Sequence, residues 1–200
     1  MPKPLIFNDL MAEVSVPGEP RVDVRPEDVA VLQYTSGSTG TPKAAALTHA
    51  NIIASVCQTD VWIGIDDAGN AAVMCLIPFF HVFGLLACLL VCVHKGYRMV
   101  LLPRMDLMDI LSLMKLLETY QPICFPAVPS LWNAFLSLPE EKIKTCLGSL
   151  KVAICGGAPF PGAVHEKFTA VTGRRMMEAY GLSEASSATH MTPYPEGGPS

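Results

Sequence analysis

Short, almost wholly apolar runs alternate with segments of helical periodicity along most of this chain. The runs 72–77, 98–102 and 151–155 are nearly free of polar residues, whereas 107–117 repeats apolar residues at helical spacing. Strands that are apolar on both faces are typical of parallel sheets covered by helices. The sequence therefore predicts an α/β fold with a mostly parallel sheet flanked by helices on both faces.

Capping residues, a proline and a glycine indicate where the expected helices begin and end. Thr48 and Asp106 are candidate N-caps, Pro122 ends one helix and Gly173 ends another. In the helix after Thr48, one apolar face is expected to carry Ile52, Ile53, Val56 and Cys57. The expected strands are 29–32, 72–77, 98–102, 123–125, 151–155 and 175–179. The expected helices span 83–93 and 161–173, and three more begin at 48, 106 and 129.

Composition excludes several classes of protein. Half of the 200 residues are hydrophobic and 16% are charged, with a formal net charge of −4 and no basic run, so nucleic acid is not an expected partner. Seven cysteines without a Cys-x-x-Cys pair indicate a reduced, cytoplasmic setting, and the scattered histidines predict no metal cluster. Residues 71–93 carry no Asp, Glu, Lys or Arg and are long enough for a membrane span, but Pro78 divides them into a buried strand and a buried helix. We therefore expect no transmembrane segment.

The segment 34–43 combines hydroxyl side chains, two glycines and Lys43 directly after an apolar run. Glycines let the backbone turn its N–H groups toward one point, and hydroxyls and a lysine add donors, which suits a polyphosphate. A solvated turn is the alternative. The spacing is not that of a Walker A loop, because Thr41 and Pro42 separate Gly40 from Lys43.

Loops that follow the expected strands carry most of the chemistry-bearing residues. In parallel sheets ligands bind beyond the carboxyl ends of the strands, so the loops 35–43, 78–81, 156–161 and 180–184 are expected to share one cleft. The last of these supplies an aromatic ring from Tyr180 and a carboxylate from Glu184 that could hold Mg²⁺.

Four motifs, in this order and spacing, resemble the adenylate-forming (AMP-binding) superfamily, which includes acyl-CoA synthetases, coumarate CoA ligases and firefly luciferase. They are the loop 34–43 with Thr48-His49, Pro-Phe-Phe-His-Val-Phe-Gly at 78–84, Gly-Gly-Ala-Pro at 156–159, and Glu-Ala-Tyr-Gly-Leu-Ser-Glu at 178–184. The likeness covers nearly the whole chain and is greatest to medium- or long-chain fatty acid CoA ligases.

The resemblance implies a role for each motif. His81 would border the acyl pocket with Phe80 and Phe83, Ser183 would meet the α phosphate and Glu184 would coordinate magnesium. Lys43, His81, Ser183 and Glu184 form the implied catalytic set. The β and γ phosphates would be held by Thr35, Ser36, Gly37, Ser38, Thr39, Gly40 and Lys43. Adenine would lie along Gly157, Ala158 and Pro159 and against Glu178, Ala179, Tyr180, Gly181 and Leu182, with Arg104 near coenzyme A.

These roles imply an acid–CoA ligase, with ATP, magnesium and CoA, that activates a carboxylic acid to an acyl adenylate. Ala44 and Ser183 stand where the family usually has Gly and Thr, and no Asp follows Asp109. We therefore expect a central piece of an N-terminal domain: an edge segment or linker at 1–28, a nucleotide- and acyl-binding subdomain at 29–190 and a linker-like tail at 191–200. The C-terminal domain is expected to be absent, and the piece alone inactive.

Two other functions fit parts of the sequence. The first is a nucleotide-binding module without catalysis. The second is a serine hydrolase, because Gly181-Leu-Ser-Glu-Ala185 nearly matches a nucleophile elbow around Ser183, although His190 follows too closely for the usual triad order.

Overall fold

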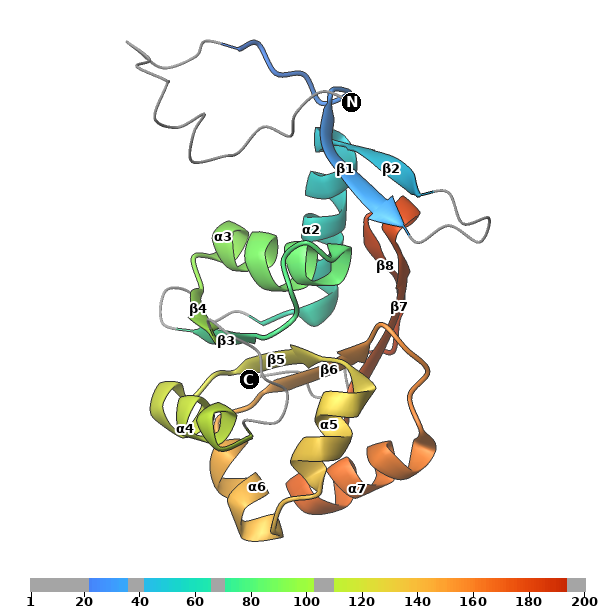
Figure 1. Ribbon diagram of the computed structural model, residues 1–200. Helices are drawn as coiled ribbons and strands as arrows, with labels where there is room; N and C mark the ends of the chain where they lie inside the picture. The colour runs from blue at the N-terminus through green and yellow to red at the C-terminus, as the bar shows by residue number, and fades with distance from the viewer. Residues whose placement is uncertain (1–21, 36–41, 66–70, 103–109, 194–200) are drawn as a thin grey trace, which may run out of the picture.

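The computed structural model describes residues 22–35, 42–65, 71–102 and 110–193. Its centre is a six-stranded sheet in the order β4-β3-β5-β6-β7-β8, and β1 and β2 form a separate antiparallel pair (Figure 1). The strands are β1 (Val29–Thr35), β2 (Lys43–Thr48), β3 (Ala72–Cys75), β4 (Arg98–Leu101), β5 (Cys124–Ala127), β6 (Val152–Gly156), β7 (Met177–Leu182) and β8 (Ser187–Met191).

The large sheet is parallel from β4 to β7, and only β8 pairs antiparallel, so the predicted α/β fold is confirmed. The inner strands β3, β5 and β6 are buried on both faces. In β3, Ala72 and Met74 pack into one core while Val73 and Cys75 pack into the other. This alternation follows from the strand period of two and explains why the run contains no polar residue.

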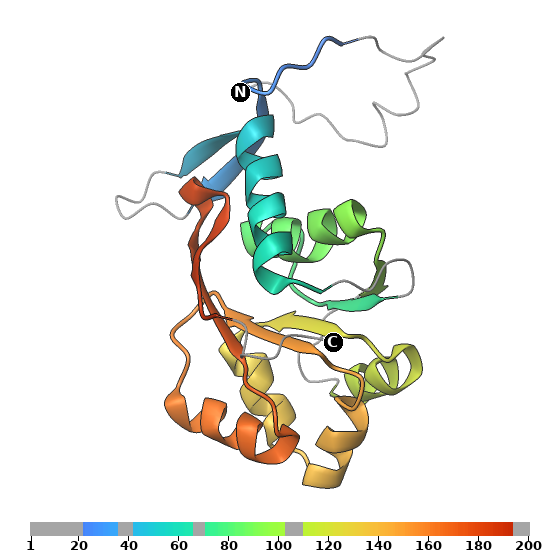
Figure 2. The same cartoon turned by 180° about the vertical axis from the view of Figure 1, so that it is seen from behind.

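Helices cover the two faces of this sheet, as Figures 1 and 2 show. One face carries α2 (His49–Ile63), the π-helix η1 (Gly84–Leu90) and α3 (Val91–Lys95). The other face carries α4 (Ile110–Tyr120), α5 (Pro129–Leu136), α6 (Glu140–Cys146) and α7 (Gly162–Thr172). The core beneath this second group centres on Trp132, which is fully buried between the rings of Phe125 and Phe168.

Several local signals act as the sequence predicts. Thr48 caps α2, since its hydroxyl accepts from the Asn51 N–H while the Asn51 side chain accepts from the Thr48 N–H. Gly173 ends α7 in the left-handed conformation. The predicted face of α2 is wrong in part: Ile52 and Val56 are buried, but Ile53 and Cys57 are exposed.

Three elements lie where the sequence does not predict them: β2, β8 and α6. The expected order of strand, loop and helix around 34–43 is therefore wrong, because β2 pairs with β1 before α2 begins. The last parallel strand begins at Met177 instead of Arg175 and continues to Leu182, so the expected loop 180–184 starts inside a strand. Asp106, the expected cap, lies outside the described residues, and α4 is described from Ile110.

In the described part of the chain, no helix combines the length and apolar character that crossing a bilayer requires. The apolar segment 71–93 divides at Pro78, as predicted, and is largely buried under the rest of the fold. All seven cysteines are free thiols, and all but Cys57 are buried.

Candidate functional site

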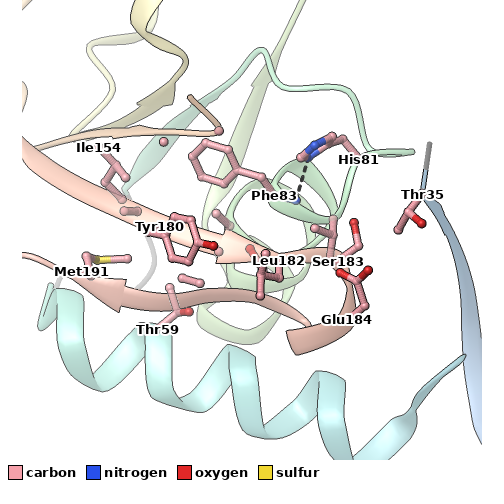
Figure 3. A pocket seen from close by; sticks show the side chains of 18 residues that line it. Thr35, Thr59, His81, Phe83, Ile154, Tyr180, Leu182, Ser183, Glu184 and Met191 are labelled. Carbon is pink, nitrogen blue, oxygen red and sulfur yellow. Dashed lines mark hydrogen bonds between the residues drawn. The ribbon is translucent and has the colours of Figure 1, made fainter. Parts of the chain in front are cut away.

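A cavity of about 280 Å³ opens between the start of η1, the end of β6 and the β7–β8 hairpin (Figure 3). Thr35, Ser183 and Glu184 gather at one end of it, and Ile154 and Met191 lie at the opposite end. The cavity therefore has a polar end, formed by hydroxyls and a carboxylate, and an apolar end.

Together with Phe83, nine of the residues predicted from the sequence line this cavity, although they come from segments far apart in the chain. They are Thr35, His81, Gly157, Ala179, Tyr180, Gly181, Leu182, Ser183 and Glu184. The hairpin of β1 and β2 reaches the site because it packs against η2 (Ser183–Ala185). Thr35 thus arrives from the small sheet, and not from a carboxyl end of the parallel sheet as expected.

His81 is exposed at the rim of the cavity and has a defined orientation. Its Nδ1 accepts a hydrogen bond from the Phe83 N–H at 3.2 Å. In the neutral ring, this leaves the proton on Nε2, which can donate to an anion. Phe83 also lines the cavity, whereas the Phe80 side chain is 82% exposed and does not.

A second cavity of about 630 Å³ adjoins the first and shares Gly157, Ala179, Tyr180, Gly181 and Met191 with it. Ala158, Pro159 and Glu178 line only this second cavity among the predicted residues. The ring of Tyr180 is 60% exposed, with its centroid 6.2 Å from that of His190. An exposed aromatic ring between two cavities offers a stacking face for a planar group.

Cys155 also borders the second cavity. Burial, with a smaller contribution from the Glu178 carboxylate, raises the pKa of its thiol to about 12. The thiol therefore stays protonated near neutral pH and is a poor nucleophile.

Two of the predicted residues that the structure describes, Lys43 and Phe80, line neither cavity. Lys43 is the exposed first residue of β2, paired with Thr35, whose hydroxyl donates to the Lys43 carbonyl at 3.4 Å. The remaining predicted residues lie outside the described residues, namely Ser36, Gly37, Ser38, Thr39, Gly40 and Arg104.

The lining residues that sequence reasoning missed include Thr59 of α2, Ala87 of η1, Ile154 of β6 and Met191 of β8. The first three lie inside elements whose pattern indicates only packing, and β8 was not predicted at all. Ile154 had one available signal, because it lies two residues before Gly156, the first residue of the Gly-Gly-Ala-Pro motif.

The geometry around Ser183 does not fit a nucleophile elbow. Ser183 begins a 3-10 turn, and the left-handed residues come later, at Ser186 and Ser187. His190 pairs across the hairpin with Tyr180, three residues before Ser183, which places it roughly 10 Å away along the strand. The His190 Nδ1 instead lies 3.0 Å from the Thr189 hydroxyl.

Over the described ranges, no group of three His, Cys, Asp or Glu side chains is placed to hold a metal ion. Glu184, exposed at the polar end of the first cavity, fits a metal site in which the protein supplies one carboxylate and a ligand supplies the rest. Mg²⁺ is commonly bound by one or two carboxylates together with the phosphates of a substrate, so one carboxylate suffices when a nucleotide supplies the other oxygens.

Comparisons with known proteins bear on the family of this chain. A family model described as AMP-binding enzyme matches residues 3–199. The long-chain-fatty-acid–CoA ligase of Bacillus subtilis is 41% identical over 172 residues, which are 86% of this chain and 30% of that protein. The chain therefore spans about 30% of the length of this relative.

Solved structures show the same fold. ATP-bound MatB from Rhodopseudomonas palustris has a TM-score of 0.75 and 26% identity, over 94% of this chain and 35% of that one. The inhibitor-bound N-terminal domain of FACL13 from Mycobacterium tuberculosis has a TM-score of 0.75 at 24% identity, over 88% of this chain and 42% of that one. The fold is that of an adenylate-forming N-terminal domain, and the chain belongs to the AMP-binding enzyme family.

Proposed function

We propose that this chain is the nucleotide- and acyl-binding part of an acid–CoA ligase. The parent protein would use ATP to convert a carboxylic acid, a medium- or long-chain fatty acid, to an acyl adenylate and then transfer the acyl group to CoA. One observation carries the proposal: a single cavity unites Thr35, His81, Ser183 and Glu184 next to the exposed ring of Tyr180. The Bacillus subtilis relative is named as such a ligase, and MatB was solved with ATP bound.

The second cavity and the two ends of the first cavity each suit a different part of the reactants. The base of ATP would stack on Tyr180 and lie along the loop 157–159 in the second cavity. The α phosphate would meet the hydroxyl of Ser183 at the polar end of the first, with the β and γ phosphates toward Thr35. The acid would place its carboxylate near Nε2 of His81 and its acyl chain toward the apolar end, lined by Phe83, Ala87, Ile154 and Met191.

The chemistry of this step is a matter of position and charge. A carboxylate oxygen attacks the α phosphorus, a P–O bond breaks and pyrophosphate leaves, so two anions must be brought together. The Nε2–H of His81 can orient the acid, and hydroxyls and backbone N–H groups can stabilise charge on phosphate oxygens. Mg²⁺ held by Glu184 would neutralise part of the phosphate charge. Lys43 would add a positive charge on the β and γ phosphates.

The domain boundaries remain part of the proposal. We propose a linker or edge segment at 1–28, a binding subdomain at 29–190 and a tail at 191–200. The described elements from β1 to β8 support the subdomain, although β8 continues to Met191 and Thr192 lines the second cavity, so the structure extends slightly beyond residue 190. CoA would approach near Arg104. Because relatives are about three times longer, we expect the isolated 200 residues to bind Mg-ATP weakly and to form no acyl adenylate.

Nucleotide binding by the isolated chain tests the assignment of Tyr180. Tyr180→Ala removes the stacking face, so we expect the Kd of Mg-ATP to rise by about tenfold, since base–aromatic stacking contributes roughly 1–3 kcal/mol. Tyr120→Ala removes a similarly exposed tyrosine from α4 and is the matched control. Calorimetric titration gives both values, and equal affinities in the two variants would contradict the assignment.

Acid-dependent exchange of labelled pyrophosphate into ATP tests the reaction. We expect exchange with medium- or long-chain fatty acids in the parent protein and none in the isolated chain. If the isolated chain catalyses this exchange, the expectation that it is inactive by itself is refuted. ATP binding without exchange in the parent protein would instead indicate a nucleotide-binding module.

A further inference from the structure

The backbone directly after Glu184 adopts an unfavourable conformation. Ser186 has φ 57° and ψ 47°, and Ser187 has φ 89°, so two consecutive residues with side chains lie in the left-handed region. In this region the Cβ atom crowds the neighbouring carbonyl oxygen, and only glycine enters it freely. Such a backbone persists only where the surrounding structure holds it.

Two contacts hold this backbone from opposite sides. The Ser55 hydroxyl, from the middle of α2, donates to the Ser186 carbonyl at 2.6 Å, and both residues are buried, with exposed fractions of 6% and 4%. On the other side Gly181 lies so close that a Cβ on it would be 2.2 Å from the Ser187 oxygen. The turn is thus fixed between the helix and the preceding strand.

The residues fixed in this way are those that present the polar groups of the site. Ser183 and Glu184 belong to the turn η2, which ends at Ala185, and Ser187 lines the same cavity. Ser55 itself does not line that cavity. Its hydroxyl can therefore influence a ligand only through the backbone that it holds.

We propose that Ser55 is a positioning residue for the phosphate and magnesium end of the site. Its hydrogen bond holds the left-handed backbone at Ser186, and this keeps the Ser183 hydroxyl and the Glu184 carboxylate directed into the cavity. This inference rests on the proposed function, because it gives the positioned groups a nucleotide ligand. Without the hydroxyl, the buried Ser186 carbonyl loses this partner and the turn opens more often.

Amide hydrogen exchange in the 200-residue chain tests the structural part. In Ser55→Ala we expect exchange at residues 183–188 to become faster by about tenfold, the size of a typical buried hydrogen bond, with no change in β6. Ser55→Thr keeps a hydroxyl and should restore slow exchange. Ser130→Ala makes the same change on the exposed surface of α5 and should leave residues 183–188 unchanged. Equal exchange at 183–188 in Ser55→Ala and the wild-type chain overturns the inference.

A titration with Mg-ATP, followed by amide chemical shifts, tests the functional part. We expect Ser55→Ala to raise the Mg²⁺ concentration needed for half-maximal nucleotide binding by at least about threefold, with Ser55→Thr close to wild type. Faster local exchange without this shift would overturn the positioning role. If the wild-type chain binds no Mg-ATP, the proposed function fails while the exchange result still stands.

Discussion

Replacing Gly181 with alanine is the sharpest test of how the β7–β8 hairpin forms the site. A Cβ at position 181 would lie 2.2 Å from the Ser187 oxygen and 2.6 Å from its carbonyl carbon. This is roughly 1.3 Å short of ~3.5 Å, the lower end of the optimal separation of nonbonded heavy atoms. Both clashing atoms belong to the backbone of β8, so no side chain can rotate away, and the hairpin must shift.

The expected cost follows from this shift. Inserting a methyl group into a close-packed site costs typically about 1–3 kcal/mol, and a strand that moves away also weakens its ladder hydrogen bonds. We expect the free energy of unfolding to fall by about 2–3 kcal/mol, which for a chain of this size lowers Tm by roughly 5–10 °C.

Gly162→Ala provides the matched control, because an added Cβ there meets nothing within 4 Å. Thermal and urea unfolding, followed by far-UV circular dichroism, should separate the two variants clearly. We expect Gly162→Ala to match or slightly exceed the stability of the wild-type chain, since alanine favours a helix over glycine. If Gly181→Ala is as stable as Gly162→Ala, the close approach of β7 and β8 does not require glycine and the reasoning is refuted.

Three further predictions depend on which side chains are buried. Trp132→Phe removes the indole N–H that donates to the Ile154 carbonyl at 3.1 Å, and we expect a loss of about 2–3 kcal/mol in urea unfolding; a loss below 1 kcal/mol would contradict the bond's contribution. Labelling of the native chain with a thiol reagent near pH 8 should modify Cys57 alone, because the other six cysteines are buried. Burial raises the pKa of Cys146 to about 11 and that of Cys155 to about 12, from 9.0, so the unfolded chain ionises first and stability should fall as pH rises above 9. Stability that is flat from pH 9 to 11 would count against this.

Much of the site could be predicted because the relevant signals are local. Residues in the loops that follow the apolar runs, such as His81 and Gly157, do line one cavity. Ser183 and Glu184 also reach it, although by a different backbone from the one expected. Other lining residues could not be predicted, because Thr59 and Ala87 are helix residues whose neighbours at the cavity come from other elements.

The sequence by itself determined the alternation of buried strands and helices, the capping of α2 by Thr48 and the end of α7 at Gly173. Each depends on the pattern or conformational preference of neighbouring residues, and those are properties of the local chain. Only the tertiary structure decided that β2 and β8 are strands, since Lys-Ala-Ala-Ala-Leu-Thr and Ser-Ala-Thr-His-Met have no strong strand pattern. They become strands because β1 and β7 offer unpaired backbone groups beside them, and Gly181 lets β8 approach. Such pairing between segments is a property of the assembled fold.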